Sequence, residues 1–180
     1  MKIRILLIIT ALFMLAAPLT ASAFDGERHG FMLNLGVGFG QGKISGDGDS
    51  IDGTGICTDF KIGGGPSNQI LVYYTNRALW YSPENSSIDL VNGMSAAGVS
   101  YFLEPKAPSF FFSGALGIGV LTNSEISDSE SGFGMTLGVG YEILSNFIVE
   151  LTFMHAGLSN DYGFDANISN LALTISWLAY

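Results

Sequence analysis

The amino-acid sequence predicts an all-β fold, an eight-stranded antiparallel up-and-down transmembrane β-barrel. Three observations predict it. Bulky apolar residues alternate with small ones along most of the chain, the connections between the alternating segments are long and short in turn, and the chain begins with the layout of an export signal. The chain of 180 residues is apolar, 48% hydrophobic and only 13% charged. After residue 23, however, it contains no apolar run of 18 residues that would form a membrane-spanning helix.

Residues 1–23 are expected to be a secretory signal peptide. Lys2 and Arg4 precede an apolar stretch at 5–17, and small residues at 21–23 form a cleavage site. As a helix the apolar stretch would span about 20 Å, too short for a hydrocarbon core of roughly 30 Å. Cleavage after Ala23 leaves one domain, residues 24–180. It carries five basic and sixteen acidic side chains, a formal charge of −11.

This charge and the cysteine content exclude several classes of protein. A strongly acidic domain cannot neutralise phosphates, so no nucleic-acid partner is expected. The single cysteine, Cys57, excludes an internal disulfide framework and any cysteine-based zinc cluster. We expect no cofactor.

Period-two alternation is the strongest signal, and it is typical of strands. Between residues 31 and 39 every second residue is large and apolar, and the residues between them are mostly glycine. Residues 132–143 and 168–179 repeat the pattern. The alternation predicts eight strands, at 30–40, 54–64, 69–79, 88–103, 110–121, 132–143, 147–158 and 168–179.

The predicted connections alternate in length. The long polar ones lie at 41–53, 80–87, 122–131 and 159–167, and the short ones at 65–68, 104–109 and 144–146. Four long loops at one end and three short turns at the other place both ends of the barrel domain on the short-turn side. Outer-membrane barrels have this arrangement, with longer loops outside the cell and short turns in the periplasm.

The two faces of the strands indicate which one meets lipid. A water-soluble barrel such as a lipocalin turns its apolar face inward and needs a charged exterior. Here the second face is glycine, alanine, serine and threonine, which suits a narrow lumen better than a solvated surface. We therefore expect the bulky face to contact lipid. The few charged residues of the strands are expected to form a polar network in the lumen: Asp59, Lys61, Arg77, Glu142 and Glu150.

The chain resembles the small Gram-negative outer-membrane β-barrels (OmpA-like and OmpX-like barrels). The features that carry the resemblance are the export signal, the eight alternating segments, the long loops and a last strand ending in Tyr180. The resemblance implies a place in the cell's outer membrane, contact with outer-membrane lipids and lipopolysaccharide, and insertion by the barrel assembly machinery through the aromatic end of the C-terminal strand. Tyr180 is out of phase with the apolar series that ends at Trp177. Either a bulge near Leu178 or a turn of the final residue would restore the pattern.

A second, local resemblance concerns His155. Its surroundings are similar to those of PagL-type lipid A deacylases, which implies an acyl hydrolase with a serine nucleophile and a histidine base. The position two residues after His155 is Gly157, and the nearest following serine, Ser159, would lie about 13 Å away along an extended strand. The alternative is a histidine that ends the apolar face of its strand.

The long connections are acidic. Asp47, Asp49 and Asp52 loosely resemble a calcium loop, but the spacing departs from the EF-hand pattern and no closing glutamate follows. A solvated acidic loop is the simpler interpretation, so no metal site is predicted. Carboxylates in the other long loops could hold divalent ions that bridge to lipopolysaccharide phosphates: Glu125, Asp128, Glu130, Asp161 and Asp165.

The sequence favours a structural or surface-interaction role, with acidic extracellular loops, an unknown surface partner and no catalytic site. A lipid A-modifying acyl hydrolase and a small-solute channel are the alternatives. The hydrolase requires a nucleophile beside His155, and the channel requires a continuous open lumen.

Overall fold

A computed structural model describes residues 27–46, 49–83, 90–123, 129–159 and 165–180, and for Asp49, Asn123 and Asp165 it describes the backbone alone. The predicted signal peptide lies outside these ranges. No helix in the described ranges is long and apolar enough to cross a membrane.

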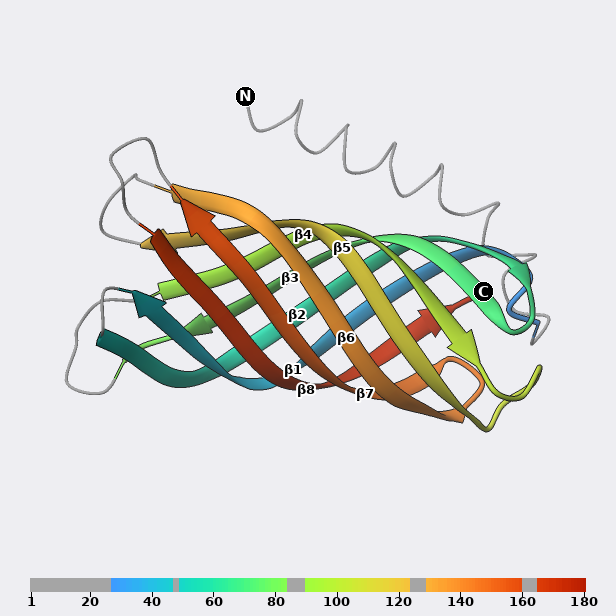
Figure 1. Ribbon diagram of the computed structural model, residues 1–180. Coiled ribbons are helices and arrows are strands. Elements are labelled where there is room, and N and C mark those ends of the chain that lie inside the picture. The colour runs from blue at the N-terminus through green and yellow to red at the C-terminus, as the bar shows by residue number, and fades with distance from the viewer. Residues whose placement is uncertain (1–26, 47–48, 84–89, 124–128, 160–164) are drawn as a thin grey trace, which may run out of the picture.

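Eight antiparallel strands form a closed barrel in which each strand pairs with its neighbours in sequence and β1 also pairs with β8 (Figure 1). The predicted fold class is confirmed. The strands are β1 (Gly30–Gly46), β2 (Asp49–Ser67), β3 (Ile70–Tyr81), β4 (Leu90–Phe102), β5 (Ser109–Asn123), β6 (Ser129–Leu144), β7 (Phe147–Ser159) and β8 (Asp165–Ala179).

The two ends of the barrel differ as predicted. Gly30, Tyr180 and the short connections β2–β3, β4–β5 and β6–β7 lie at one end, on the right in Figure 1. We call this the short-turn end, and the opposite one the loop end. Asn146, in the β6–β7 turn, has a φ of 79°, and its side-chain amide donates to the Leu178 carbonyl at 2.7 Å.

The strands extend farther toward the loop end than the sequence indicated. The predicted loop 41–53 is mostly strand, since β1 continues to Gly46 and β2 begins at Asp49. The predicted loops 122–131 and 159–167 are shortened in the same way. The connection predicted at 80–87 is not, since β3 ends at Tyr81 and β4 begins only at Leu90. The reason is that a β-ladder uses only backbone groups, so pairing continues beyond the point where the outward side chains become polar.

The bulky apolar face points outward, which confirms the assignment made from the sequence. Leu137 and Leu173 are 56% and 53% exposed, whereas Thr174, on the opposite face of β8, is fully buried. Apolar side chains cover the outside of all eight strands. Because this surface would be costly in water and favourable in hydrocarbon, it is the surface of a transmembrane barrel.

The interior differs in one respect from the expected lining of glycine and small polar residues. Apolar clusters fill the lumen toward both ends, and the charged residues lie between them. Glycine is required where the backbone of a neighbouring strand comes close: a Cβ on Gly38 would overlap the Leu173 carbonyl oxygen, and one on Gly55 would overlap the Trp80 carbonyl oxygen. Inward small residues therefore let neighbouring strands approach.

Replacing Leu137 with arginine tests the outward assignment. A cation in the middle of the lipid-facing band should lower the free energy of unfolding by about 2–4 kcal/mol, measured by denaturant titration in lipid vesicles. Ser131→Arg, on the same outward face of β6 but toward the loop end, is the matched control and should cost about 0–1 kcal/mol. Equal losses in the two variants would contradict a lipid-facing Leu137.

Candidate functional site

Four buried charges meet in the middle of the lumen. Asp59 and Lys61 project inward from β2, Arg77 from β3 and Glu150 from β7. Lys61 Nζ lies 2.6 Å from Glu150 Oε2 and 3.3 Å from Asp59 Oδ2. Arg77 Nη2 lies 2.8 Å from Asp59 Oδ2 and 3.2 Å from Glu150 Oε2. The structure thus brings together four of the five residues that the sequence assigned to the lumen.

The four charges form an electrically neutral cluster. Each cation contacts both carboxylates, and hydroxyl groups donate to the remaining oxygens, Thr75 to Asp59 at 3.2 Å and Ser113 to Glu150 at 2.5 Å. Burying one of these charges alone would cost several kcal/mol, and the cost is offset only while its partners remain in place. The cluster therefore ties β2 and β3 to β5 and β7 across the lumen.

The lumen has little free space beside this cluster. A cavity of about 10 Å³ lies among Lys61, Tyr73, Arg77 and Glu150. One water molecule needs roughly that much. At this level the described part of the barrel is closed by its own side chains, and this does not favour a solute channel.

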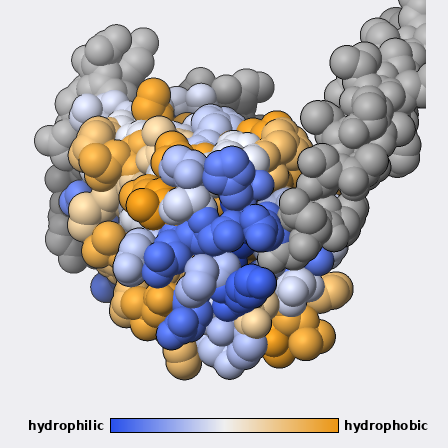
Figure 2. Space-filling view, turned by 90° about the vertical axis from the view of Figure 1, so that its right-hand side faces the viewer, coloured by the Kyte–Doolittle hydropathy of each residue, from blue (hydrophilic) through white to orange (hydrophobic). Residues whose placement is uncertain are grey.

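The fifth predicted lumenal residue, Glu142, lies apart from the cluster, at the short-turn end. It forms a salt bridge with the guanidinium of Arg28, just before β1, and accepts a hydrogen bond from the Tyr180 hydroxyl at 2.6 Å. Arg28 Nη1 also donates at 2.8 Å to the carbonyl oxygens of Asn68 and Glu104, in two different turns. Figure 2 shows hydrophilic residues in the middle of this end, with hydrophobic residues around them.

Sequence reasoning missed Arg28, and it misjudged Tyr180. Arg28 precedes the first alternating segment, so periodicity could not place it, yet it is 1% exposed and lies 3.9 Å from the centre of the Phe102 ring. Tyr180 continues the inward series of β8 without a bulge. Neither a bulge near Leu178 nor a turn of the last residue is present, because the hydroxyl has a partner inside the lumen.

On the outside of the barrel, His155 is paired with a serine, but not with Ser159. His155 Nδ1 lies 3.0 Å from the hydroxyl of Ser169, its direct partner on β8. Ser159 lies four residues farther along β7, opposite Asp165. Both His155 and Ser169 are half-buried and belong to the outward faces of their strands.

Within the described residues, the ladder neighbours of the pair do not include the third group that a serine hydrolase needs to orient its histidine. A catalytic histidine is oriented by a third group, commonly a carboxylate, and donors must surround the developing oxyanion. On its other side, across the β6–β7 ladder, His155 faces Met135, which cannot orient an imidazole as a carboxylate would. The described geometry is a histidine–serine hydrogen bond at the barrel surface.

The candidate metal ligands are only partly described. Asp47 lies outside the described residues, and for Asp49 only the backbone is described. Asp52 is exposed, and its carboxylate accepts a hydrogen bond from Gln41 at 3.4 Å. Within the described ranges no group of three or more His, Cys, Asp or Glu is arranged to hold a metal ion. Glu125, Asp128 and Asp161 lie outside these ranges, and Glu130 is half-buried at the start of β6.

Comparison with solved structures confirms the resemblance at the level of the fold. The barrel is similar to Ail, the attachment invasion locus protein of Yersinia pestis, with a TM-score of 0.61 and 15% identity over 83% of this chain and 99% of that one. It is also similar to Neisserial surface protein A, with a TM-score of 0.58 and 13% identity over 81% and 96%. No protein-family model matches the chain, and no curated protein matches its sequence.

A double-mutant cycle on the lumenal cluster tests whether its charges are coupled. Lys61→Met leaves two carboxylates with one cation, and Glu150→Gln leaves two cations with one carboxylate. Each should therefore lower the free energy of unfolding by about 3–5 kcal/mol. The double variant keeps the neutral Arg77–Asp59 pair and should lose less than the sum by at least about 1 kcal/mol. Strictly additive losses in denaturant titrations would contradict the coupling.

Proposed function

We propose that the protein is an integral β-barrel of the Gram-negative outer membrane, exported by a signal peptide that is cleaved after Ala23, with a structural or surface-interaction role. The observation that carries this proposal is the contrast between the two sides of one closed wall. The outer side offers lipid a continuous apolar surface, and the inner side is filled by paired charges and apolar clusters.

The packed lumen supports a structural role over transport. Coupled charges in the middle and the Arg28–Glu142–Tyr180 contacts at the short-turn end fix the barrel from within. A wall held in this way is a rigid support for the connections at the loop end. Loops carried on a rigid scaffold are the usual place for recognition.

The charge of the loop end constrains its partners. One structure of Ail was solved with the heparin analogue sucrose octasulfate. In this chain the long connections carry most of the acidic residues outside the lumen. Repulsion between like charges therefore disfavours a sulfated polysaccharide here. Cationic proteins, or divalent ions that bridge to lipopolysaccharide, are better matched.

The C-terminal strand is the expected contact with the barrel assembly machinery. Its outward residues Leu171, Leu173 and Ile175 are about half exposed and form an apolar ridge. Tyr180 lies inside the folded barrel, so recognition of its ring would have to precede closure of β8 on β1.

Fractionation of cells that produce the full chain tests the location. The protein should sediment with the outer membrane, begin at Phe24 after processing, and change its electrophoretic mobility on heating, because a closed barrel resists detergent until it is boiled. Recovery in the soluble periplasmic fraction, or an N-terminus that retains residues 1–23, would contradict the proposal.

The absence of acyl hydrolase activity is also expected. Mass analysis of lipid A from cells with and without the protein should give the same acylation pattern, because no carboxylate orients the His155 ring from its Met135 side. A product lacking one acyl chain that appears with the unaltered protein and disappears with Ser169→Ala would establish an enzyme instead.

A further inference from the structure

Polar side chains with hydrogen-bond donors cluster on the outside of β7, β8 and β1, where the apolar band ends. The outward apolar series finish at Phe153 on β7, Leu171 on β8 and Phe39 on β1. The next two outward residues of each strand toward the loop end, and a third on β1, carry donors, apart from Gly157. We call them the donor patch: His155, Asn167, Ser169, Gln41, Lys43 and Ser45.

The strand register brings these side chains together. Lys43 pairs with Ser169 across the β1–β8 ladder, and Ser169 pairs with His155 across the β7–β8 ladder. Side chains opposite each other on one face of a sheet have Cβ atoms about 4.5–5.5 Å apart. An ammonium group, a hydroxyl and an imidazole therefore stand side by side on three neighbouring strands. In the next row Ser45 pairs with Asn167.

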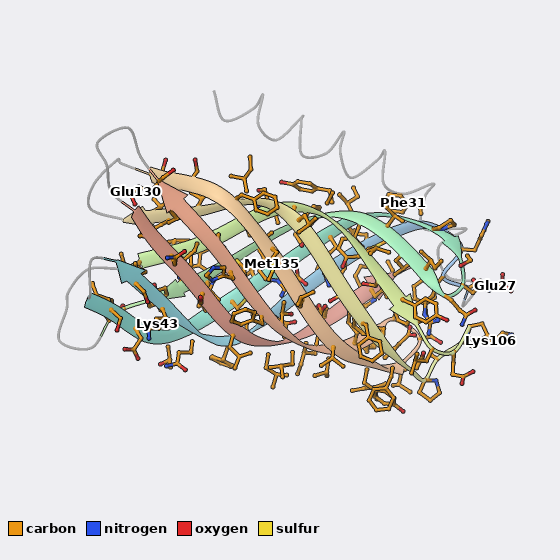
Figure 3. The ribbon with its side chains drawn as sticks, viewed as in Figure 1. Glu27, Phe31, Lys43, Lys106, Glu130 and Met135 are labelled. Atoms are coloured by element: carbon orange, nitrogen blue, oxygen red, sulfur yellow. The ribbon has the colours of Figure 1, made fainter. Side chains whose placement is uncertain are left out.

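Lys43 is the cation of this patch, and its position differs from that of the other basic residues after Ala23. After Ala23 the chain has four other basic residues. Three of them, Arg28, Lys61 and Arg77, are buried in the lumen with carboxylate partners. The fourth, Lys106, lies in the β4–β5 turn at the opposite end of the barrel from Lys43 (Figure 3). Among the described residues the Lys43 ammonium makes no salt bridge, although Asp52 is its partner across the β1–β2 ladder.

The hydrogen bond between His155 and Ser169 orients the histidine ring in the donor patch. Their hydrogen bond at 3.0 Å occupies Nδ1 of the ring, so the ring is held against β8 with Nε2 left for a further contact. Held side chains lose less conformational entropy when a ligand binds. The patch thus combines one charge with a pre-oriented polar pair.

We propose that the donor patch binds the phosphate group of a phosphorylated lipid in the membrane leaflet on the loop side. Lys43 supplies the charge, and the hydrogen-bonded Ser169–His155 pair supplies one further donor. This donor is the ring N–H at Nε2 when the serine hydroxyl donates to Nδ1, and the serine hydroxyl when Nδ1 carries the proton. This inference rests on the proposed function, because only a membrane-embedded barrel brings lipid to this height. Lipid phosphates lie just outside the hydrocarbon region, at the level where the outward residues of these strands change from apolar to polar. A phosphate accepts several charge-assisted hydrogen bonds at once, which suits adjacent donors.

Substitution of Asp52 distinguishes direct binding of the phosphate from binding through a metal ion. Its carboxylate, held by Gln41, lies next to Lys43 on the outside of the barrel. If the phosphate binds the donors directly, Asp52 repels it and Asp52→Asn should tighten binding. If a divalent ion bridges carboxylate and phosphate, the same change should weaken binding.

The test is native mass spectrometry of the barrel, purified folded from outer membranes and titrated with lipid A that carries two phosphates. Lys43→Gln should weaken binding roughly fivefold, the effect of one lysine at a charged lipid surface, and Ser169→Ala roughly threefold. Lys106→Gln removes the same charge at the short-turn end and should change nothing. Dephosphorylated lipid A should bind the unaltered barrel more weakly than the phosphorylated lipid binds Lys43→Gln, because it loses the hydrogen bond of the Ser169–His155 pair as well as the attraction of Lys43. Inorganic phosphate alone should not compete at equal concentration, because it lacks the acyl chains that the apolar band holds.

Three results would overturn the proposal: equal losses from Lys43→Gln and Lys106→Gln, equal binding of both lipids, or weaker binding by Asp52→Asn. Heat-modifiable mobility of every variant shows that the barrel has folded. A failure of the headgroup site is therefore distinguishable from a failure of membrane insertion, in which the unaltered protein itself would not be recovered from outer membranes.

Discussion

The pairing of β1 with β8 is the constraint on which the rest of the structure depends. Thirteen residues of β1, from Leu33 to Ser45, have partners on β8. This ladder removes the two free edges that an eight-stranded sheet would otherwise expose. In hydrocarbon each unpaired backbone group costs several kcal/mol, so an open sheet could not cross a membrane. Once the sheet is closed, alternate side chains must point either into lipid or into a narrow lumen.

The narrow lumen in turn determines where charge is tolerated. Four charges in its middle neutralise one another, and Arg28 enters the short-turn end to pair with Glu142. Three of the five basic residues after Ala23 are thus used inside the barrel. Such pairs add little stability relative to an apolar filling, but removing one partner leaves a buried charge. Each buried charge therefore depends on partners that other strands supply.

The sequence predicted what alternation encodes and missed what depends on register. Leu137 and Gly138 could be assigned to opposite faces because neighbouring residues of a strand always point to opposite sides. The ends of β1 and β2 could not be predicted, because the pairing of these polar ends runs through the backbone ladder, which alternation of side chains does not report. The hydrogen-bond partner of His155 could not be predicted from the sequence either. Ser169 lies beside it through cross-strand pairing, whereas a search along the chain finds Ser159. The inward place of Tyr180 depends on Glu142, 38 residues away.

As a result, positive charge is distributed unevenly over the outer surface of the barrel. Of the five basic residues after Ala23, three are buried in the lumen and two, Lys43 and Lys106, lie outside it at opposite ends of the barrel (Figure 3). Acidic loops repel the anionic surface of a lipid layer, and an apolar band alone does not distinguish one lipid from another. Lys43, at the loop-end limit of the apolar band, can therefore favour one class of lipid over another. It lies at the level expected for lipid phosphates and beside the Ser169–His155 pair, and this gives one side of the wall a preferred lipid.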